Sequence, residues 1–202
     1  MGMFLTMTGV ANIALQEVRA EVEQIAQEVG SPLEESHDDD SEDQCVLCES
    51  ASGHVTVVWP DQGDWDFEML AQRLSERLRR PALGLHIHDD DLWMYLLYSS
   101  GKLVDKFNPL PDYWGELEEE DMASWGGRAD VVCEHWPSVS KEAVSKYLRK
   151  WDFEDTGKAY PDDEFEVNDC WQLVDFMRRL GLDYPDPGNS VINKVHLHSR
   201  RN

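Results

Sequence analysis

The sequence predicts an α+β fold, in which helices flank a mainly antiparallel sheet of about five strands and the C-terminal part is helical. Two observations favour this fold class. Residues 44–107 contain short runs with strand-like apolar patterns, and most are joined by turns too short for parallel crossovers. Elsewhere, apolar residues recur every three or four positions, which is typical of helices that pack on a sheet.

The N-terminal part, residues 1–32, is predicted to contain one amphipathic helix. Its apolar stripe covers residues 11–29 in alternating steps of four and three, and Gly30 and Pro32 end it. Such a stripe must be buried, either on the rest of the domain or against a second copy of the chain. The sequence therefore leaves the choice between monomer and dimer open.

Residues 33–43 are predicted to be an acidic linker. Seven of the residues in 34–43 are acids and none is apolar, a composition typical of solvated, mobile chain. Residues 1–10 have neither a basic region nor a long apolar stretch, so they do not resemble a signal peptide. Four cysteines are too few for a disulfide scaffold, which favours a cytoplasmic protein with reduced thiols.

Residues 44–122 are predicted to form the sheet region. A helical stripe over 67–78 interrupts the strands, and Asp64 or Asp66 can cap this helix. The run over 92–98 is apolar at both parities, which predicts a strand covered on both faces in the centre of the sheet. The five predicted strands cover residues 44–48, 54–59, 82–88, 92–98 and 102–107.

Residues 123–202 are predicted to form a helical region that packs on the sheet, so that the chain is one compact unit. Apolar stripes at helical spacing indicate three helices, and residues 191–197 have the pattern of a short strand. The three helices cover residues 129–136, 144–151 and 170–180, with Ser138 or Ser140 capping the second and Asn168 the third.

The charge of the chain restricts its partners. It carries 41 acidic against 18 basic residues, a formal net charge of -23. Removing the seven acids of residues 34–43 still leaves 34 acids, so the charge belongs mainly to the folded surface. Nucleic acid and anionic membranes are unfavourable partners for such a surface, and no apolar run approaches the length of a membrane span. A basic protein is the partner that this charge favours.

A strand with two histidines is one candidate metal site. His86 and His88 are two residues apart, which places both imidazoles on one face of a strand. Asp89 and Asp91 follow in the next turn and could complete the coordination of a divalent metal. The alternative interpretation is a polar strand face followed by an acidic hairpin turn.

A second metal interpretation concerns Cys45 and Cys48. The C-x-x-C spacing occurs in zinc sites, but it needs two further ligands, and His37 and His54 are the nearest candidates. A structural role in a strand is the alternative, because apolar Val46 and Leu47 separate the two thiols.

No sequence motif marks a catalytic centre. The nucleophile elbow, the P-loop and the dinucleotide-binding glycine pattern are all absent from the sequence, and the many acids single out no pair as general acid and base. The sequence therefore favours a protein without catalytic activity, and no cofactor is expected unless the alternative metal site exists.

Aromatic residues between acids are the candidate binding residues. Aromatic side chains anchor protein interfaces, and complementary charge selects the partner. The first hypothesis is therefore a non-catalytic acidic module, such as an inhibitor or immunity-type protein, that binds a basic partner. The alternative is a metal-binding protein or metal-dependent enzyme that uses the His86/His88 strand. The candidate binding residues are Trp65, Tyr113, Trp114, Glu118, Glu119 and Glu120.

Overall fold

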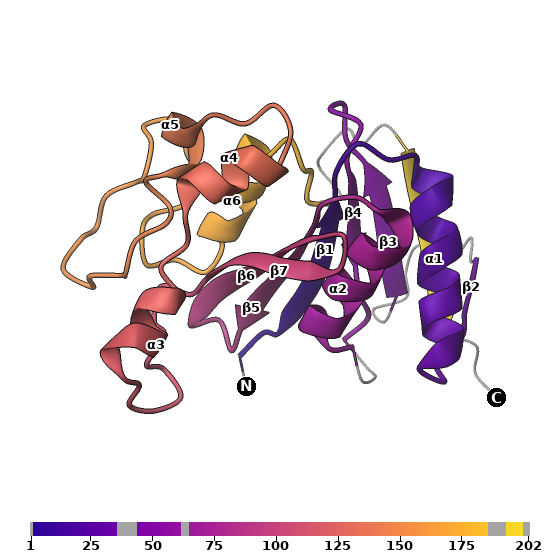
Figure 1. Ribbon diagram of the computed structural model, residues 1–202, viewed down its shortest axis with the longest axis horizontal. Coiled ribbons are helices and arrows are strands. Elements are labelled where there is room, and N and C mark those ends of the chain that lie inside the picture. Colours follow the sequence, from indigo (N-terminus) through magenta and orange to yellow (C-terminus); the bar gives the residue numbers. More distant parts are fainter. Residues whose placement is uncertain (1, 36–43, 62–64, 186–192, 200–202) are drawn as a thin grey trace.

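The computed structural model describes residues 2–35, 44–61, 65–185 and 193–199 (Figure 1). These residues form one antiparallel sheet of eight strands, in the order β2-β8-β3-β4-β1-β5-β6-β7, together with six helices. The strands are β1 (Leu5–Val10), β2 (Leu33–Glu35), β3 (Gln44–Glu49), β4 (Val55–Val58), β5 (Ala82–His88), β6 (Leu92–Ser99), β7 (Lys102–Phe107) and β8 (Asn193–Ser199). The helices are α1 (Leu15–Glu28), α2 (Phe67–Leu78), α3 (Glu119–Ser124), α4 (Ala129–His135), α5 (Lys141–Val144) and α6 (Gln172–Arg179).

The α+β class and the antiparallel sheet are confirmed, but the predicted number of five strands is too low. β1 lies inside the sheet, between β4 and β5, and β8 lies between β2 and β3. The first three residues of the predicted linker form β2, whereas residues 36–43 lie outside the described part of the chain. β6 is buried on both faces as predicted, but it is next to the edge strand β7 rather than in the centre.

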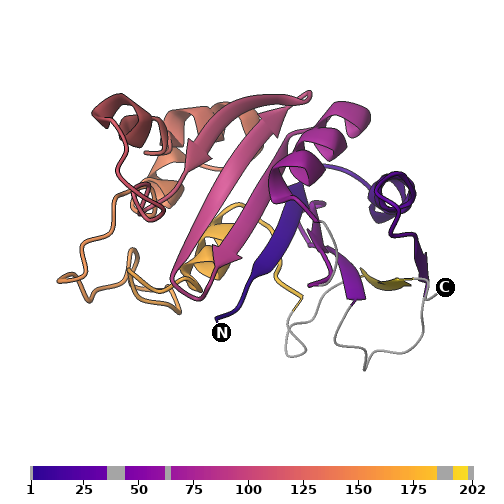
Figure 2. The same ribbon diagram turned by 90° about the horizontal axis from the view of Figure 1, so that it is seen from below.

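Helices α1 and α2 cover one face of the sheet (Figures 1 and 2). The predicted stripe of α1 is buried at Val18, Val22 and Ile25, which pack in one cluster with Leu70 and Leu74 of α2. α1 therefore covers its apolar side within the chain. Asp66, one of the two predicted caps of α2, accepts a hydrogen bond from the Met69 amide at 2.9 Å.

Helices α4, α5 and α6 form the layer on the opposite face, over β5 to β7 (Figure 2). Phe176 of α6 stacks on Tyr95 of β6, with ring centroids 5.5 Å apart, and contacts Trp93 at a tilted angle, with ring centroids 5.2 Å apart. The Trp136 indole donates a hydrogen bond to the Leu180 carbonyl at 2.9 Å, which joins α4 to the end of α6. These aromatic contacts belong to a hydrophobic cluster that is larger than the cluster under α1 and α2.

Two details of the predicted C-terminal helices are wrong. The helix expected over 144–151 ends at Val144 after its cap Ser140, and Tyr147 and Trp151 are buried from turns. Asn168 does not cap α6, because its backbone is left-handed (φ 73°) and its amide donates to carbonyls in the 152–155 loop. The periodic apolar pattern therefore predicted which residues are buried. It did not predict their backbone, because residues outside helices can be buried in the same way.

Within the described residues, no helix is both long enough and apolar enough to span a membrane.

Candidate functional site

The β5–β6 hairpin positions the two histidines of the predicted metal site. β5 runs through His88, and the turn that follows has a left-handed backbone at Asp89 and Asp90 (φ 53° and 60°). Both imidazoles lie on the same face of β5, as predicted, with ring centroids 5.8 Å apart. The other parity of β5, which includes Leu85 and Ile87, packs under the C-terminal helices.

An aromatic patch surrounds the outer histidine. It consists of Phe4, His88, Tyr113 and Trp114, which come from three separate segments of the chain. Edge-to-face contacts join the four rings: His88 lies 4.8 Å from Phe4, 5.6 Å from Tyr113 and 5.0 Å from Trp114. Three of these side chains are exposed, Phe4 to 45%, Tyr113 to 37% and Trp114 to 57%. The structure thus brings part of the predicted metal set and part of the predicted binding set into one surface.

Carboxylates flank the aromatic patch. The Tyr113 hydroxyl donates to Asp91 at 2.5 Å, and this hydrogen bond raises the pKa of the tyrosine. Asp89 accepts a hydrogen bond from the Gly2 amide at 2.9 Å. Residues 108–125 contain six acids and no lysine or arginine, and Glu118, Glu119 and Glu120 are exposed at the start of α3. The glutamates at the start of α3 and the aspartates of the β5–β6 turn therefore give this end of the sheet a strongly negative electrostatic potential.

The inner histidine is held as a neutral packing residue. His86 stacks on Phe67 at 5.0 Å, and its Nδ1 lies 3.2 Å from the Thr6 hydroxyl. Burial, with the nearby His88 adding to it, lowers the pKa of His86 to about 4. His86 is therefore uncharged at neutral pH.

The metal interpretations receive no support from the described residues. Among them, no group of three or more His, Cys, Asp and Glu side chains is arranged to hold a metal ion. The predicted set His86, His88, Asp89 and Asp91 forms aromatic and hydrogen-bonding contacts instead.

The two cysteines of the C-x-x-C motif point to opposite faces of β3, because residues three apart in a strand do not share a face. Cys45 packs in the cluster under α1 and α2, whereas the Cys48 thiol donates to the Asp183 carbonyl at 3.4 Å on the other face. Burial raises the pKa of Cys48 to about 11 and raises that of Cys45 further. These thiols cannot hold one zinc ion together.

Trp65 lies apart from the aromatic patch. It is only 9% exposed and stacks on Trp59 at 5.3 Å in the core next to α2. Trp65 is flanked by acids in the sequence, but its indole packs in the core.

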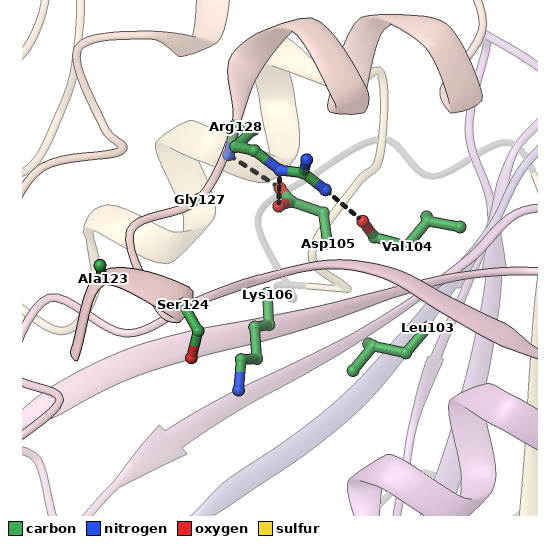
Figure 3. A pocket seen from close by; sticks show the side chains of 8 residues that line it. All are labelled: Leu103, Val104, Asp105, Lys106, Ala123, Ser124, Gly127 and Arg128. Atoms are coloured by element: carbon green, nitrogen blue, oxygen red, sulfur yellow. Dashed lines mark hydrogen bonds and ion pairs between the residues drawn. The ribbon is translucent and has the colours of Figure 1, made fainter. Parts of the chain in front are cut away.

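A cleft of about 390 Å³ lies between β7 and the segment that leads into α4 (Figure 3). Its buried carboxylate, Asp105, accepts hydrogen bonds from the Tyr95 hydroxyl at 2.6 Å and from the Arg128 backbone amide at 2.9 Å. The Arg128 guanidinium contacts Asp105 and the Val104 carbonyl. These contacts join β7 to residues 123–128, so the polar groups that line the cleft have a structural role.

Sequence reasoning did not identify four exposed apolar side chains of the described residues. Phe4 (45% exposed) precedes β1, Leu103 (45%) lies in β7, Leu117 (38%) lies between acids, and Phe153 is 69% exposed in the loop before α6. For Leu117 and Phe153 the available signal was an apolar residue flanked by acids, because such a segment offers little apolar surface to cover it.

No protein-family model, no curated protein and no solved structure matches this chain.

Proposed function

We propose that this chain is a non-catalytic protein-binding module, of the inhibitor or immunity type, whose aromatic patch and surrounding acids bind a basic partner protein. The observation that carries this proposal is the exposure of Phe4, Tyr113 and Trp114 in one ring cluster with carboxylates around it. Exposed aromatics anchor protein interfaces, and depletion of basic residues around them selects a basic partner.

The geometry of the patch supports a preformed binding surface. The four rings contact one another at near-perpendicular angles of 75° to 88°, an arrangement favourable for aromatic pairs. Because the rings are already packed, binding would immobilise few side chains. The hairpin turn and the Tyr113–Asp91 hydrogen bond fix the position of the two flanking segments.

Co-purification with matched variants tests the proposal. Trp114→Ala should weaken retention of a basic partner from native extract by at least about 30-fold, as at an interface hot spot. Phe153→Ala is the matched control, because it removes an exposed aromatic from another acidic loop. Retention should also fall steeply between low and high salt, since exposed charges are screened.

Equal retention by both variants, or retention that salt leaves unchanged, would contradict the proposed function. The melting temperature of each variant is compared with that of the unchanged chain. Equal values show that the alanine has altered the surface and not the fold.

A further inference from the structure

A shallow hollow lies beside the aromatic patch. Its lining includes Pro111, Trp114, Glu116, Leu117 and Trp125, and its volume is about 280 Å³. The wall is mostly apolar, with two indoles and one carboxylate. From this lining we infer that the hollow receives an arginine side chain of the partner, with the guanidinium against the exposed Trp114 indole and paired to Glu116. This inference rests on the proposed function and names the group that the surface recognises.

The chain itself shows that one of these indoles accepts a cation. The Lys106 ammonium lies 4.2 Å from the centre of the Trp125 ring. An aromatic face attracts a cation through its quadrupole, most strongly when the ring is an indole. Trp114 offers a second indole to the same hollow and is 57% exposed.

The carboxylate provides the second half of the recognition. Glu116 is exposed and lines both this hollow and a neighbouring one of about 490 Å³, which Asp112 and Met122 also line. A guanidinium is planar, stacks on aromatic rings and donates two parallel hydrogen bonds to one carboxylate. A lysine ammonium is a compact charge that lacks both the planar stacking surface and the fixed pair of parallel donors. The combination therefore favours arginine over lysine.

The positive charges near the hollow are fewer than the negative ones. Lys106 contacts Trp125, and Lys150 forms an ion pair with Asp112 at 3.3 Å. Around them, residues 108–125 contribute six acids and no base. The net field at the hollow attracts a cation.

Three peptides that differ only at one central position test the inference. This position is arginine, lysine or uncharged citrulline, and the same lysines surround it in all three. Binding is measured by titration, and the indole N–H signals of Trp114 and Trp125 are followed by NMR. The arginine peptide should shift both signals and bind about 5–10-fold more tightly than the citrulline peptide. The lysine peptide should fall between them.

Two charge-matched variants locate the carboxylate. Glu116→Gln should remove most of the preference for arginine over citrulline, whereas Glu154→Gln, at an exposed acid outside the proposed binding surface, loses the same charge and should keep that preference. Equal effects of the two variants would overturn the inference, as would citrulline or lysine peptides that bind as tightly as the arginine peptide.

The two proposals fail separately. If a basic partner depends on Trp114 but not on Glu116, the patch binds the partner and the arginine site is refuted. If the arginine peptide occupies the hollow but no partner depends on Trp114, the proposed function is refuted and the arginine site stands.

Discussion

For His86 the sequence predicts the position of the side chain better than its role. Its spacing from His88 predicts a shared strand face, which the structure has. In the structure the ring stacks on Phe67 and faces the Thr6 hydroxyl. A local pattern defines the direction of a side chain, but the groups it meets come from α2 and β1, far away in the sequence.

The neutral state of His86 makes folding stability depend on pH. In the folded chain its pKa is about 4, against roughly 6.5 in an unfolded chain, so the unfolded state binds the proton more readily. The contribution of neutral His86 to the free energy of unfolding is complete above about pH 6.5. It is lost as the pH falls towards 4, which lowers the free energy of unfolding by up to roughly 3 kcal/mol.

His86→Phe should therefore flatten the loss of stability between about pH 6.5 and 4, measured by urea unfolding at several pH values. Thr6→Val is the matched control: it removes the hydroxyl next to the imidazole but leaves the titrating group, so its pH dependence should follow the unchanged chain. If the phenylalanine variant loses stability as steeply as the unchanged chain, burial of His86 is not the cause.

At the scale of elements, the packing of α2 on β5 depends on the small residue Gly84. A Cβ at this position would lie 2.9 Å from the Phe67 carbonyl oxygen and 3.0 Å from the Ala71 Cβ. Because the first of these atoms belongs to the backbone, α2 would have to move away from the sheet.

Gly84→Ala should lower the free energy of unfolding by roughly 1–3 kcal/mol, as overpacking in a core does. Gly157→Ala is the control, since its added Cβ would make only an ordinary contact at 3.4 Å from Asp155. Chemical denaturation of both variants measures the difference. A Gly84 variant as stable as the control would show that α2 can shift without cost.

The strands that pair with their neighbours in the sequence could be predicted, whereas β1, whose two partners are both distant in the chain, was missed. The β5, β6 and β7 meander follows from its own alternation and short turns. β1 alternates apolar Leu5 and Met7 with Thr6 and Thr8, but this pattern is short, and its partners β4 and β5 are distant in the chain. The aromatic patch escaped prediction for the same reason, because Phe4 meets His88 only through the pairing of β1 with β5.

At the scale of the whole molecule, the net charge of -23 opposes folding through self-repulsion. Surface ion pairs such as Arg149–Asp155 offset little of it, because exposed pairs contribute about 0–1 kcal/mol each. The sequence was sufficient to predict the sign and size of this charge. Its concentration around the patch required the structure, since β1, the β5–β6 hairpin and residues 108–125 meet only in the fold.

Added salt should therefore raise the melting temperature by a few degrees between about 0.01 and 0.2 M sodium chloride, while it weakens binding to a basic partner. Removing two exposed carboxylates, by Glu154→Gln and Glu166→Gln, should reduce this gain. Calorimetry at several salt concentrations checks both statements. A melting temperature that falls with salt would mean that ion pairs outweigh repulsion.

The position of β8 has a consequence for synthesis on the ribosome. β3 pairs with β8 over its whole length, from Gln44 with His198 to Glu49 with Asn193, and β2 pairs only with β8 within the described sheet. Both strands are translated long before their shared neighbour. During that interval β2 and the β8-facing edge of β3 are open to other chains, so the emerging polypeptide is exposed to mispairing until residues 193–199 leave the exit tunnel.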